Sequence, residues 1–371
     1  MDPITFRRHI HSHPELSFEE HATAKFIGAA LSEEGISYRT IASTGILAKI
    51  EGKGDLRRAV VLRADIDALP IEEKTGVEFA SLNSGVMHAC GHDMHAAMLF
   101  GALCELNRSR EFEGTIFGLF QPGEECNPGG ASMVLAEEPF EGYDIMAVVG
   151  QHVDATLEVG EVGFRAGKFM ASGDELRFSV CGVGGHAAMR ERLKDPVAAM
   201  AELVTSLLAL NHPDRVLSIG RIEADGATNV VPSVVKIEGT LRTFDEGERR
   251  ATKQQIRDKA AELSALHKLD IVVDINDGYP CVVCDEGLTN VAANVAAKSY
   301  DVEWLERRAT AEDFGYYCTR YPSLFYRLGV GREAGAAHTS TFCPSEGAIR
   351  VGIELMSSLA LRFLDYEKQE K

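Results

Sequence analysis

The spacing of apolar and polar positions divides the first part of the chain into helices and short strands. Apolar residues recur at helical spacing over residues 21–34 and 93–106, and Asp93 is expected to be the N-cap of the second helix. Three mainly apolar runs are typical of strands covered on both faces, at residues 59–67, 115–120 and 144–149. This alternation predicts an α/β domain built on a central mixed sheet.

Polar side chains stand where these three runs end. Asp65 and Asp67 end the first run, Glu124 and Glu125 follow the second, and His152 follows the third. Because ligands of α/β sheets bind at the carboxyl ends of the strands, we expect these side chains to gather at one edge of the sheet. The pattern therefore predicts the functional site at that edge.

The pattern changes after about residue 170. Strands are expected at residues 174–182, 216–223, 234–242 and 269–275, with helices at 196–210 and 245–267. Asp195 and Asp245 precede the two helices as N-caps. The order β-α-β-β-α-β is the ferredoxin-like arrangement, so this part is expected to form a small domain inserted into the larger one.

A helix-rich pattern resumes after Gly278, at residues 290–299, 311–314 and 349–364. The predicted organisation is therefore a catalytic α/β domain in two parts, residues 1–168 and 277–371. The inserted domain would occupy residues 169–276.

Composition narrows the classes of function. The chain has 371 residues and is 45% hydrophobic and 25% charged, which is ordinary for a globular protein of two domains. Its net charge of −18 argues against a nucleic-acid partner or an anionic membrane surface. The chain has neither a run of membrane-spanning length nor a leader pattern, so we expect a cytoplasmic protein. The eight cysteines should then be reduced, with Cys281 and Cys284 as free thiols.

The most specific chemistry lies in two short segments, His-Ala-Cys-Gly-His-Asp and Gln-Pro-Gly-Glu-Glu. Cys90 and His92 are one residue apart, so an extended or turning backbone can aim both side chains the same way. Thiolate, imidazole and carboxylate are ligands that borderline divalent metals accept. With Glu124 and Glu125 adjacent, one carboxylate remains free to act as a base. We interpret the two segments as the core of a hydrolytic metal centre.

Other residues have possible roles around this centre. His152 is favoured as a further ligand, Asp67 as the acceptor for a ligating imidazole, and Asp65 could either ligate or orient a ligand. Arg242 could clamp a substrate carboxylate and supply the local positive charge that an acidic protein lacks. Three histidines would not share one face of a helix and are expected to be structural or pocket-lining: His9, His11 and His13.

Nine motifs occur in order along nearly the whole chain. They are HPELSFE at 13–19, RADIDALP at 63–70, HACGHD at 88–93, FQPGEE at 120–125, GGHAA at 184–188, NVVP at 229–232, GTLRT at 239–243, AEDF at 311–314, and His338. At these residues the chain resembles the amidohydrolase branch of the aminoacylase and carboxypeptidase metallohydrolases. That branch includes hippurate hydrolases, auxin-conjugate hydrolases and N-acetyldiaminopimelate deacetylases.

The resemblance implies two divalent metal ions per subunit, with Zn, Mn, Co and Ni all compatible with mixed ligands. It implies five metal ligands: Cys90, His92, Glu125, His152 and His338. It also implies Glu124 as the general base, His186 as an assisting group from the partner subunit, and Asn229 with Arg242 as the holder of the substrate carboxylate. The inserted domain would form a homodimer and close over the site.

The function expected from these features is hydrolysis of the amide bond of N-acyl amino acids or short peptide-like substrates. Alternatives are a metallo-carboxypeptidase or dipeptidase of the same fold, and a metal-binding interaction protein without activity. A cysteine hydrolase using Cys90 is a further hypothesis, although His92 is too near in sequence for an ordinary dyad and the Glu pair would have no role.

Overall fold

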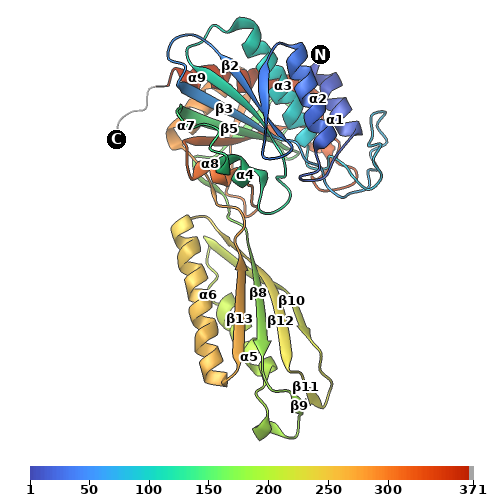
Figure 1. Cartoon of the computed structure of the whole chain (residues 1–371), viewed down its shortest axis with the longest axis vertical. Coiled ribbons are helices and arrows are strands. Elements are labelled where there is room, and N and C mark those ends of the chain that lie inside the picture. The colour runs from blue at the N-terminus through green and yellow to red at the C-terminus, as the bar shows by residue number, and fades with distance from the viewer. Residues whose placement is uncertain (367–371) are drawn as a thin grey trace. The chain divides into compact units, whose positions relative to one another are not determined.

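The computed structural model describes residues 1–366, which form two compact units (Figure 1). The large unit contains Met1–Gly167, Val283–Glu306 and the residues from Asp313 onward, and the small unit contains Lys168–Val282 and Arg307–Glu312. The mixed α/β fold class expected from the sequence is confirmed. The functional division into a catalytic and an inserted domain stays a prediction.

The large unit is built on a mixed sheet of eight strands among the described residues, in the order β1-β2-β4-β3-β5-β16-β6-β15. The strands are β1 Ser37–Ile41, β2 Gly45–Glu51, β3 Arg58–Asp65, β4 Thr115–Gln121, β5 Asp144–Asp154, β6 Glu161–Phe164, β15 Asp301–Trp304 and β16 Ser323–Gly329. The four adjacent strands β4, β3, β5 and β16 run parallel to one another. Their carboxyl ends therefore meet at one edge of the sheet, as the sequence pattern predicted.

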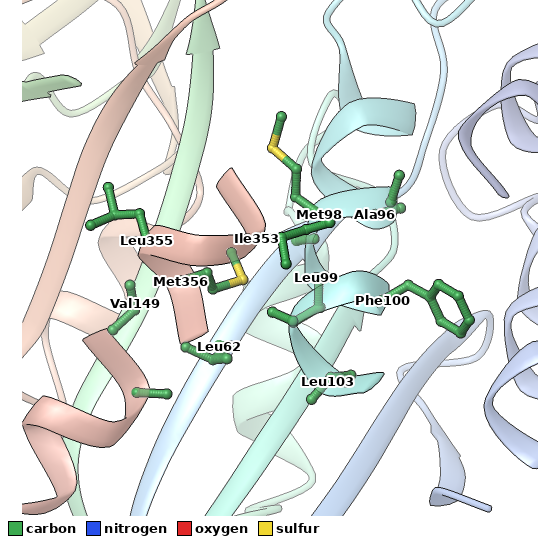
Figure 2. Close-up of a cluster of buried hydrophobic side chains, with 14 of the residues drawn as sticks. Leu62, Ala96, Met98, Leu99, Phe100, Leu103, Val149, Ile353, Leu355 and Met356 are labelled. Carbon is green, nitrogen blue, oxygen red and sulfur yellow. The ribbon is translucent and has the colours of Figure 1, made fainter. Parts of the chain in front are cut away.

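Helices cover this sheet. They are α1 Pro3–Ser12, α2 His21–Glu33, α3 His92–Ser109, α4 Gly130–Ala136, α7 Glu286–Ala296, α8 Gly315–Cys318 and α9 Gly347–Leu364. Helices α3 and α9 pack against each other and against the central strands. Side chains such as Leu62 of β3, Leu99 of α3 and Met356 of α9 are fully buried in this layer (Figure 2). Their burial is the main stabilising contribution to the unit.

The small unit has a four-stranded antiparallel sheet in the order β10-β12-β8-β13. Its elements are β8 Asp174–Cys181, β9 Gly185–His186, α5 Pro196–Leu208, β10 Arg215–Ala224, β11 Val230–Val231, β12 Val234–Thr243, α6 Glu246–His267 and β13 Asp270–Asn276. Apolar residues of α5 and α6 pack on the sheet, and Figure 1 shows α6 lying along it. The chain order and the strand order are those of the predicted ferredoxin-like arrangement.

Helix caps of the small unit follow the predicted chemistry. Asp195 accepts hydrogen bonds from the first backbone N–H groups of α5, which begins with Pro196. Asp245 accepts from Gly247 and Glu248 at the start of α6. Both caps are confirmed, because a short carboxylate satisfies N–H groups that have no partner within the helix. Two further short strands, β7 Gly167–Met170 and β14 Val282–Cys284, lie where the chain passes between the units.

The prediction of Asp93 as the N-cap of a helix is wrong. Helix α3 begins at His92 with Gly91 as the N-cap, so Asp93 lies in the first turn. Its carboxylate pairs with Arg7 and His11 of α1 instead. Burying an unpaired charge costs more free energy than leaving a helix without a side-chain cap. The prediction that three histidines of this N-terminal segment do not share one face agrees with the structure: the rings of His9 and His13 stack with centroids 4.5 Å apart, whereas His11 faces Asp93.

The strand β16 was missed in the sequence. It is fully buried in the centre of the sheet, although the pattern after Gly278 predicted only helices. Arg327 interrupts its apolar run, which removes the usual signal of a covered strand. In addition, the segment 311–314 is not helical, and a short helix, α8, begins only at Gly315.

The cysteines form no disulfide among the described residues. All eight cysteines lie within the described range and are free thiols. The Sγ atoms of Cys281 and Cys284 each donate to a backbone oxygen, of Thr243 and of Phe325 respectively. Across residues 1–366, none of the helices has both the length and the apolar character needed to cross a bilayer.

Candidate metal centre

Five side chains of the large unit, all candidates from the sequence, meet at the carboxyl edge of its sheet. Cys90 precedes α3, His92 is its first residue, Glu125 follows β4, His152 lies in β5, and His338 lies in a loop. The Cys90 Sγ lies 3.4 Å from Nε2 of His152 and 3.4 Å from Nε2 of His338. Glu125 Oε1 lies 3.2 Å from His338 Nε2 and 3.9 Å from His92 Nε2. The structure thus gathers sulfur, nitrogen and oxygen donors in one cluster.

Two of the imidazoles are oriented by acceptors on their outer nitrogen. His92 Nδ1 donates to the backbone oxygen of Asp67 at 2.9 Å and faces its carboxylate Oδ1 at 3.1 Å. His152 Nδ1 donates to the backbone oxygen of Val153 at 2.7 Å. With the proton on Nδ1, each ring directs the lone pair of Nε2 into the cluster.

The donor set fits a divalent metal. His92 Nε2 is buried and has no hydrogen-bond partner among the described residues, which is costly unless a cation takes its lone pair. Burial raises the pKa of the Cys90 thiol to about 12, so the thiol keeps its proton unless a cation stabilises the thiolate. Burial opposes protonation of His92, but the Asp65 carboxylate raises the pKa of this imidazole well above its ordinary value. A bound cation would therefore take the place of protons on Cys90 and His92.

Glu124 lies beside this cluster. Its carboxylate, that of Glu125 and the imidazole of His92 offer atoms that all lie within 4.8 Å of one another. The Glu124 side chain is buried, although the residue lies in a loop rather than a helix or strand. The loop at Pro122 and Gly123, where Gly123 has a φ of 60°, lets both glutamates face the same site, as the sequence predicted.

The carboxylate of Asp65 has two hydrogen-bond partners beside the cluster. Its Oδ2 accepts from Arg63 Nη1 at 2.6 Å, and its Oδ1 accepts from His95 Nδ1 at 2.5 Å. His95 Nε2 in turn accepts the backbone N–H of Val153 at 3.0 Å, next to His152. These contacts support an orienting role for Asp65, while its carboxylate, His92 and His95 also offer atoms within 4.8 Å of one another, so both roles expected for it stay predictions.

Sequence reasoning missed Arg63 and His95, and both had a readable signal. Arg63 lies two residues before Asp65 on β3, so the two side chains share a face. Its other nitrogen, Nη2, donates to Asp313 at 2.7 Å. His95 follows His92 by three residues on α3, the spacing that places both rings on one side of a helix.

The small unit contains the remaining candidates. His186 and Asn229 are both exposed. They are adjacent because β9 pairs with β11 and the Ala187 N–H donates to the backbone oxygen of Asn229 at 2.9 Å. Figure 1 shows β9 and β11 at the end of this unit where β12 begins. Arg242 lies eight residues after Val234, the first residue of β12, which is about 27 Å along the strand at the usual rise per residue. A single chain therefore does not bring Asn229 and Arg242 together.

Comparisons with known proteins agree with the motifs. A family model described as peptidase family M20/M25/M40 matches residues 61–362. The N-acetyl-L-cysteine deacetylase of Bacillus subtilis strain 168 is 37% identical over 377 residues, covering 99% of this chain and 89% of the relative. The N-acyl-L-amino acid amidohydrolase of Geobacillus stearothermophilus is 39% identical over 295 residues, covering 77% of this chain and 79% of the relative.

A solved structure is similar over the same extent. It is a dinuclear metal-binding peptidase of family M20 from Bacillus subtilis, with a TM-score of 0.87, 34% identity and coverage of 98% of each chain. The fold, the ordered motifs and these matches confirm the family predicted from the sequence: this chain belongs to peptidase family M20/M25/M40.

Proposed function

We propose that this protein is a metal-dependent amidohydrolase that cleaves the amide bond of N-acyl amino acids, giving a carboxylate and an amino acid. The observation that carries the proposal is the buried donor cluster of Cys90, His92 and Glu125 with a second carboxylate, that of Glu124, beside it. The deacetylase and the amidohydrolase named above support the substrate class.

The proposed ligands of two divalent ions are the five residues of the cluster: Cys90, His92, Glu125, His152 and His338. Zn, Mn, Co and Ni all accept this mixture of donors, and the family relationship supports a pair of ions. When bound, such ions lower the pKa of water and polarise the scissile carbonyl.

The proton transfers are assigned to Glu124. As general base it takes a proton from the attacking water, and as general acid it returns that proton to the nitrogen of the leaving amine. The C–N bond breaks as the new C–O bond completes the carboxylate. A buried carboxylate that is not one of the five ligands is suited to this task.

His186 is proposed to donate a hydrogen bond to the oxyanion that forms when water attacks the carbonyl. Its Nδ1 accepts the backbone N–H of Ala188 at 3.2 Å, which leaves the proton of the neutral ring on Nε2 as a donor. Asn229, next to it, and Arg242 are proposed to hold the substrate carboxylate.

Because Asn229 and Arg242 lie at opposite ends of β12, we infer that two subunits contribute to each site. A homodimer through the small unit fits the position of β10 at the edge of its sheet. An edge strand presents unpaired backbone groups that a second copy can pair with. Analytical ultracentrifugation tests this, and a monomer at working concentrations would contradict it.

A cytoplasmic location, supported by the free cysteines, belongs to the same proposal.

A nucleophilic role of Cys90 is disfavoured on different grounds from those the sequence offered. The structure does supply imidazole partners, since His152 and His338 each lie 3.4 Å from Sγ. However, burial raises the pKa of this thiol to about 12, whereas a nucleophilic cysteine needs a lowered pKa.

The test is a panel of N-acetyl amino acids, N-benzoyl amino acids and dipeptides, assayed on chelated and then metal-reconstituted protein. We expect turnover of N-acyl amino acids only with metal. Glu124→Gln should lower kcat by at least about 100-fold while metal content stays at the wild-type level. Hydrolysis of dipeptides alone would favour a dipeptidase, and a metal-loaded wild type inactive on the whole panel would contradict the proposal.

A further inference from the structure

The loop that carries Glu124 is held by a segment to which no role has been given above. The motif HPELSFE and the residue after it, Glu20, lie between α1 and α2. The Glu124 loop follows β4 and has neither helical nor extended backbone. A general base on such a loop transfers protons efficiently only if its backbone is fixed, because misplacement by about 1 Å can cost about 100-fold in rate.

Glu20 binds the backbone of the loop at the residue before Glu124. Its Oε1 accepts the backbone N–H of Gly123 at 2.8 Å, and its Oε2 accepts the Thr44 hydroxyl at 2.5 Å. The side chain is fully buried, and burial raises the pKa of this carboxyl above its ordinary value. Burying a carboxyl group costs free energy, so its hydrogen bond to the loop is a specific arrangement rather than a surface contact.

Glu20 is free for this task because another residue caps the helix. Glu20 is the N-cap residue of α2, yet its side chain makes no capping hydrogen bond. Glu15 accepts from the backbone N–H groups of Ala22 and Thr23 at 3.1 and 2.8 Å and so replaces it. Glu15 thus caps the helix, and Glu20 of the same segment is left to bind the loop.

Ser17 acts on the other side of Glu124 through Asp67. The Ser17 hydroxyl donates to Asp67 Oδ2 at 2.7 Å, and the same oxygen accepts the backbone N–H of Glu125 at 2.9 Å. The hydroxyl therefore fixes the carboxylate that holds the second amide of the loop. The two amides that flank Glu124 are each bound by a carboxylate.

Phe18 closes the arrangement sterically. A Cβ atom on Gly123 would lie only 2.3 Å from the Phe18 ring, so a residue with a side chain cannot occupy this position without displacing the ring. Phe18 itself has a φ of 65°, a backbone conformation that non-glycine residues adopt only when the surroundings impose it. The ring and the Glu20 carboxylate thus act on the same residue of the loop.

We propose that Ser17, Phe18 and Glu20 are positioning residues for proton transfer, which hold the Glu124 loop from both sides. The assignment rests on the proposed function, because it takes Glu124 as the general base. It gives the HPELSFE motif a role in the chemistry, although none of its residues belongs to the donor cluster.

The experiment compares Glu20→Ala with Glu20→Gln in metal-loaded protein. The amide oxygen of Gln can still accept from Gly123 while its NH₂ group donates to Thr44. We therefore expect Glu20→Ala to lower kcat about 10- to 100-fold with KM and metal content unchanged, and Glu20→Gln to restore most of kcat. Ser17→Ala should lower kcat about tenfold, whereas Ser32→Ala, which removes a hydroxyl bonded within α2, should not.

Hydrogen exchange gives a readout that does not depend on activity. The amides of residues 123–126 should exchange about tenfold faster in Glu20→Ala than in wild type, with α9 unchanged. Wild-type kcat and exchange in Glu20→Ala would overturn the proposal, as would a kcat loss that follows loss of metal. If Glu20→Ala does not fold, Ser17→Ala decides by the same measurements. A wild type inactive on every substrate would contradict the proposed function. The exchange data would still test whether Glu20 holds the loop, because they do not depend on activity.

Discussion

At the residue scale, Asp67 shows how one buried carboxylate organises groups from three segments. It accepts from the Ser17 hydroxyl, from the Glu125 amide and from His92 Nδ1. Burial acts to raise the pKa of Asp67, but the hydrogen bond from His92 and the other donors lower it. The residue therefore stays ionised and keeps the lone pair of His92 Nε2 directed into the cluster.

Asp67→Asn should weaken metal binding without changing any proposed ligand. We expect the metal affinity to fall about 10- to 100-fold, the usual cost of losing a partner that orients a ligating imidazole. Competition with a chelating dye measures this without a substrate. Asp55→Asn is the matched control, because Asp55 is exposed and its side chain pairs with Arg57. Equal affinity of the two variants would contradict the prediction.

The buried imidazole of His11 makes the stability depend on pH. Its Nδ1 lies 2.9 Å from Asp93 and its Nε2 lies 3.2 Å from Glu73, with Arg7 and His88 also facing it. Burial acts against protonation, but the two carboxylates raise the pKa of His11 to about 9. Burial acts to raise the pKa of Glu73, but the hydrogen bonds from His11 and other donors lower it to about 2.

The signs of these shifts define a pH window. The contribution of His11 is complete below its ordinary pKa of 6.5 and is lost as pH rises through about 9. The contribution of Glu73 is complete above its ordinary pKa of 4.5 and is lost as pH falls toward about 2. Both are complete only between the two ordinary values.

His11→Gln should therefore remove most of the loss of stability on the alkaline side. For the wild type we expect the free energy of unfolding to fall by about 2 kcal/mol between pH 6.5 and 9 from this group. Urea unfolding followed by circular dichroism at several pH values measures the difference between the two proteins. The same alkaline slope in the variant would show that the His11 pairs are not responsible.

At the scale of elements, α3 joins the parts of the centre. It begins with His92 and carries His95 one turn later, and His95 links β3 to β5 by its hydrogen bonds to Asp65 and to the Val153 amide. Both ring nitrogens of His95 are therefore used, one as donor and one as acceptor. A single helix thus fixes the relative positions of two strands and of His152, which follows from the packing of α3 against the sheet.

Helix α9 supports α3, and its two faces allow a matched pair of substitutions. Leu355 is 1% exposed and belongs to the core layer of Figure 2, whereas Leu361 of the same helix is 37% exposed. Leu355→Ala should lower the free energy of unfolding by about 2–5 kcal/mol because it leaves a cavity. Leu361→Ala should change it by less than about 1 kcal/mol. Urea unfolding measures both, and equal effects would contradict the assigned packing.

At the scale of the whole molecule, bound cations are expected to stabilise this acidic protein. The net charge is −18, and several carboxylates are buried near the cluster, among them Asp65, Asp67 and Glu124. The proposed ligands come together only in the folded chain, so cations bound there should stabilise the fold as well as serve the reaction.

Removal of metal by a chelator should lower the thermal midpoint. At a metal concentration 100 times the dissociation constant, binding contributes about 2.7 kcal/mol, which corresponds to a shift of about 5–10 °C for a unit of this size. Differential scanning calorimetry before and after reconstitution with Zn or Mn measures it. Calcium is the control, because it prefers oxygen ligands alone and should restore little of the shift.

The sequence alone determined the residues and the local elements. Chemical type and spacing were sufficient for the caps Asp195 and Asp245, for the ferredoxin-like order, and for the candidate donors of the cluster. These features depend on neighbours along the chain, since caps, hydrophobic periodicity and closely spaced donors are local properties. The family, too, was predicted from motifs and is confirmed by the comparisons.

Only the tertiary structure decided which distant groups meet. It placed β16 in the centre of the sheet, turned Asp93 from a cap into the partner of Arg7 and His11, and brought Glu20 to the amide of Gly123. These contacts join residues far apart in the chain, and their free energy comes from pairing groups that burial has removed from water. Sequence spacing carries no information about such pairs, because burial is a property of the folded molecule.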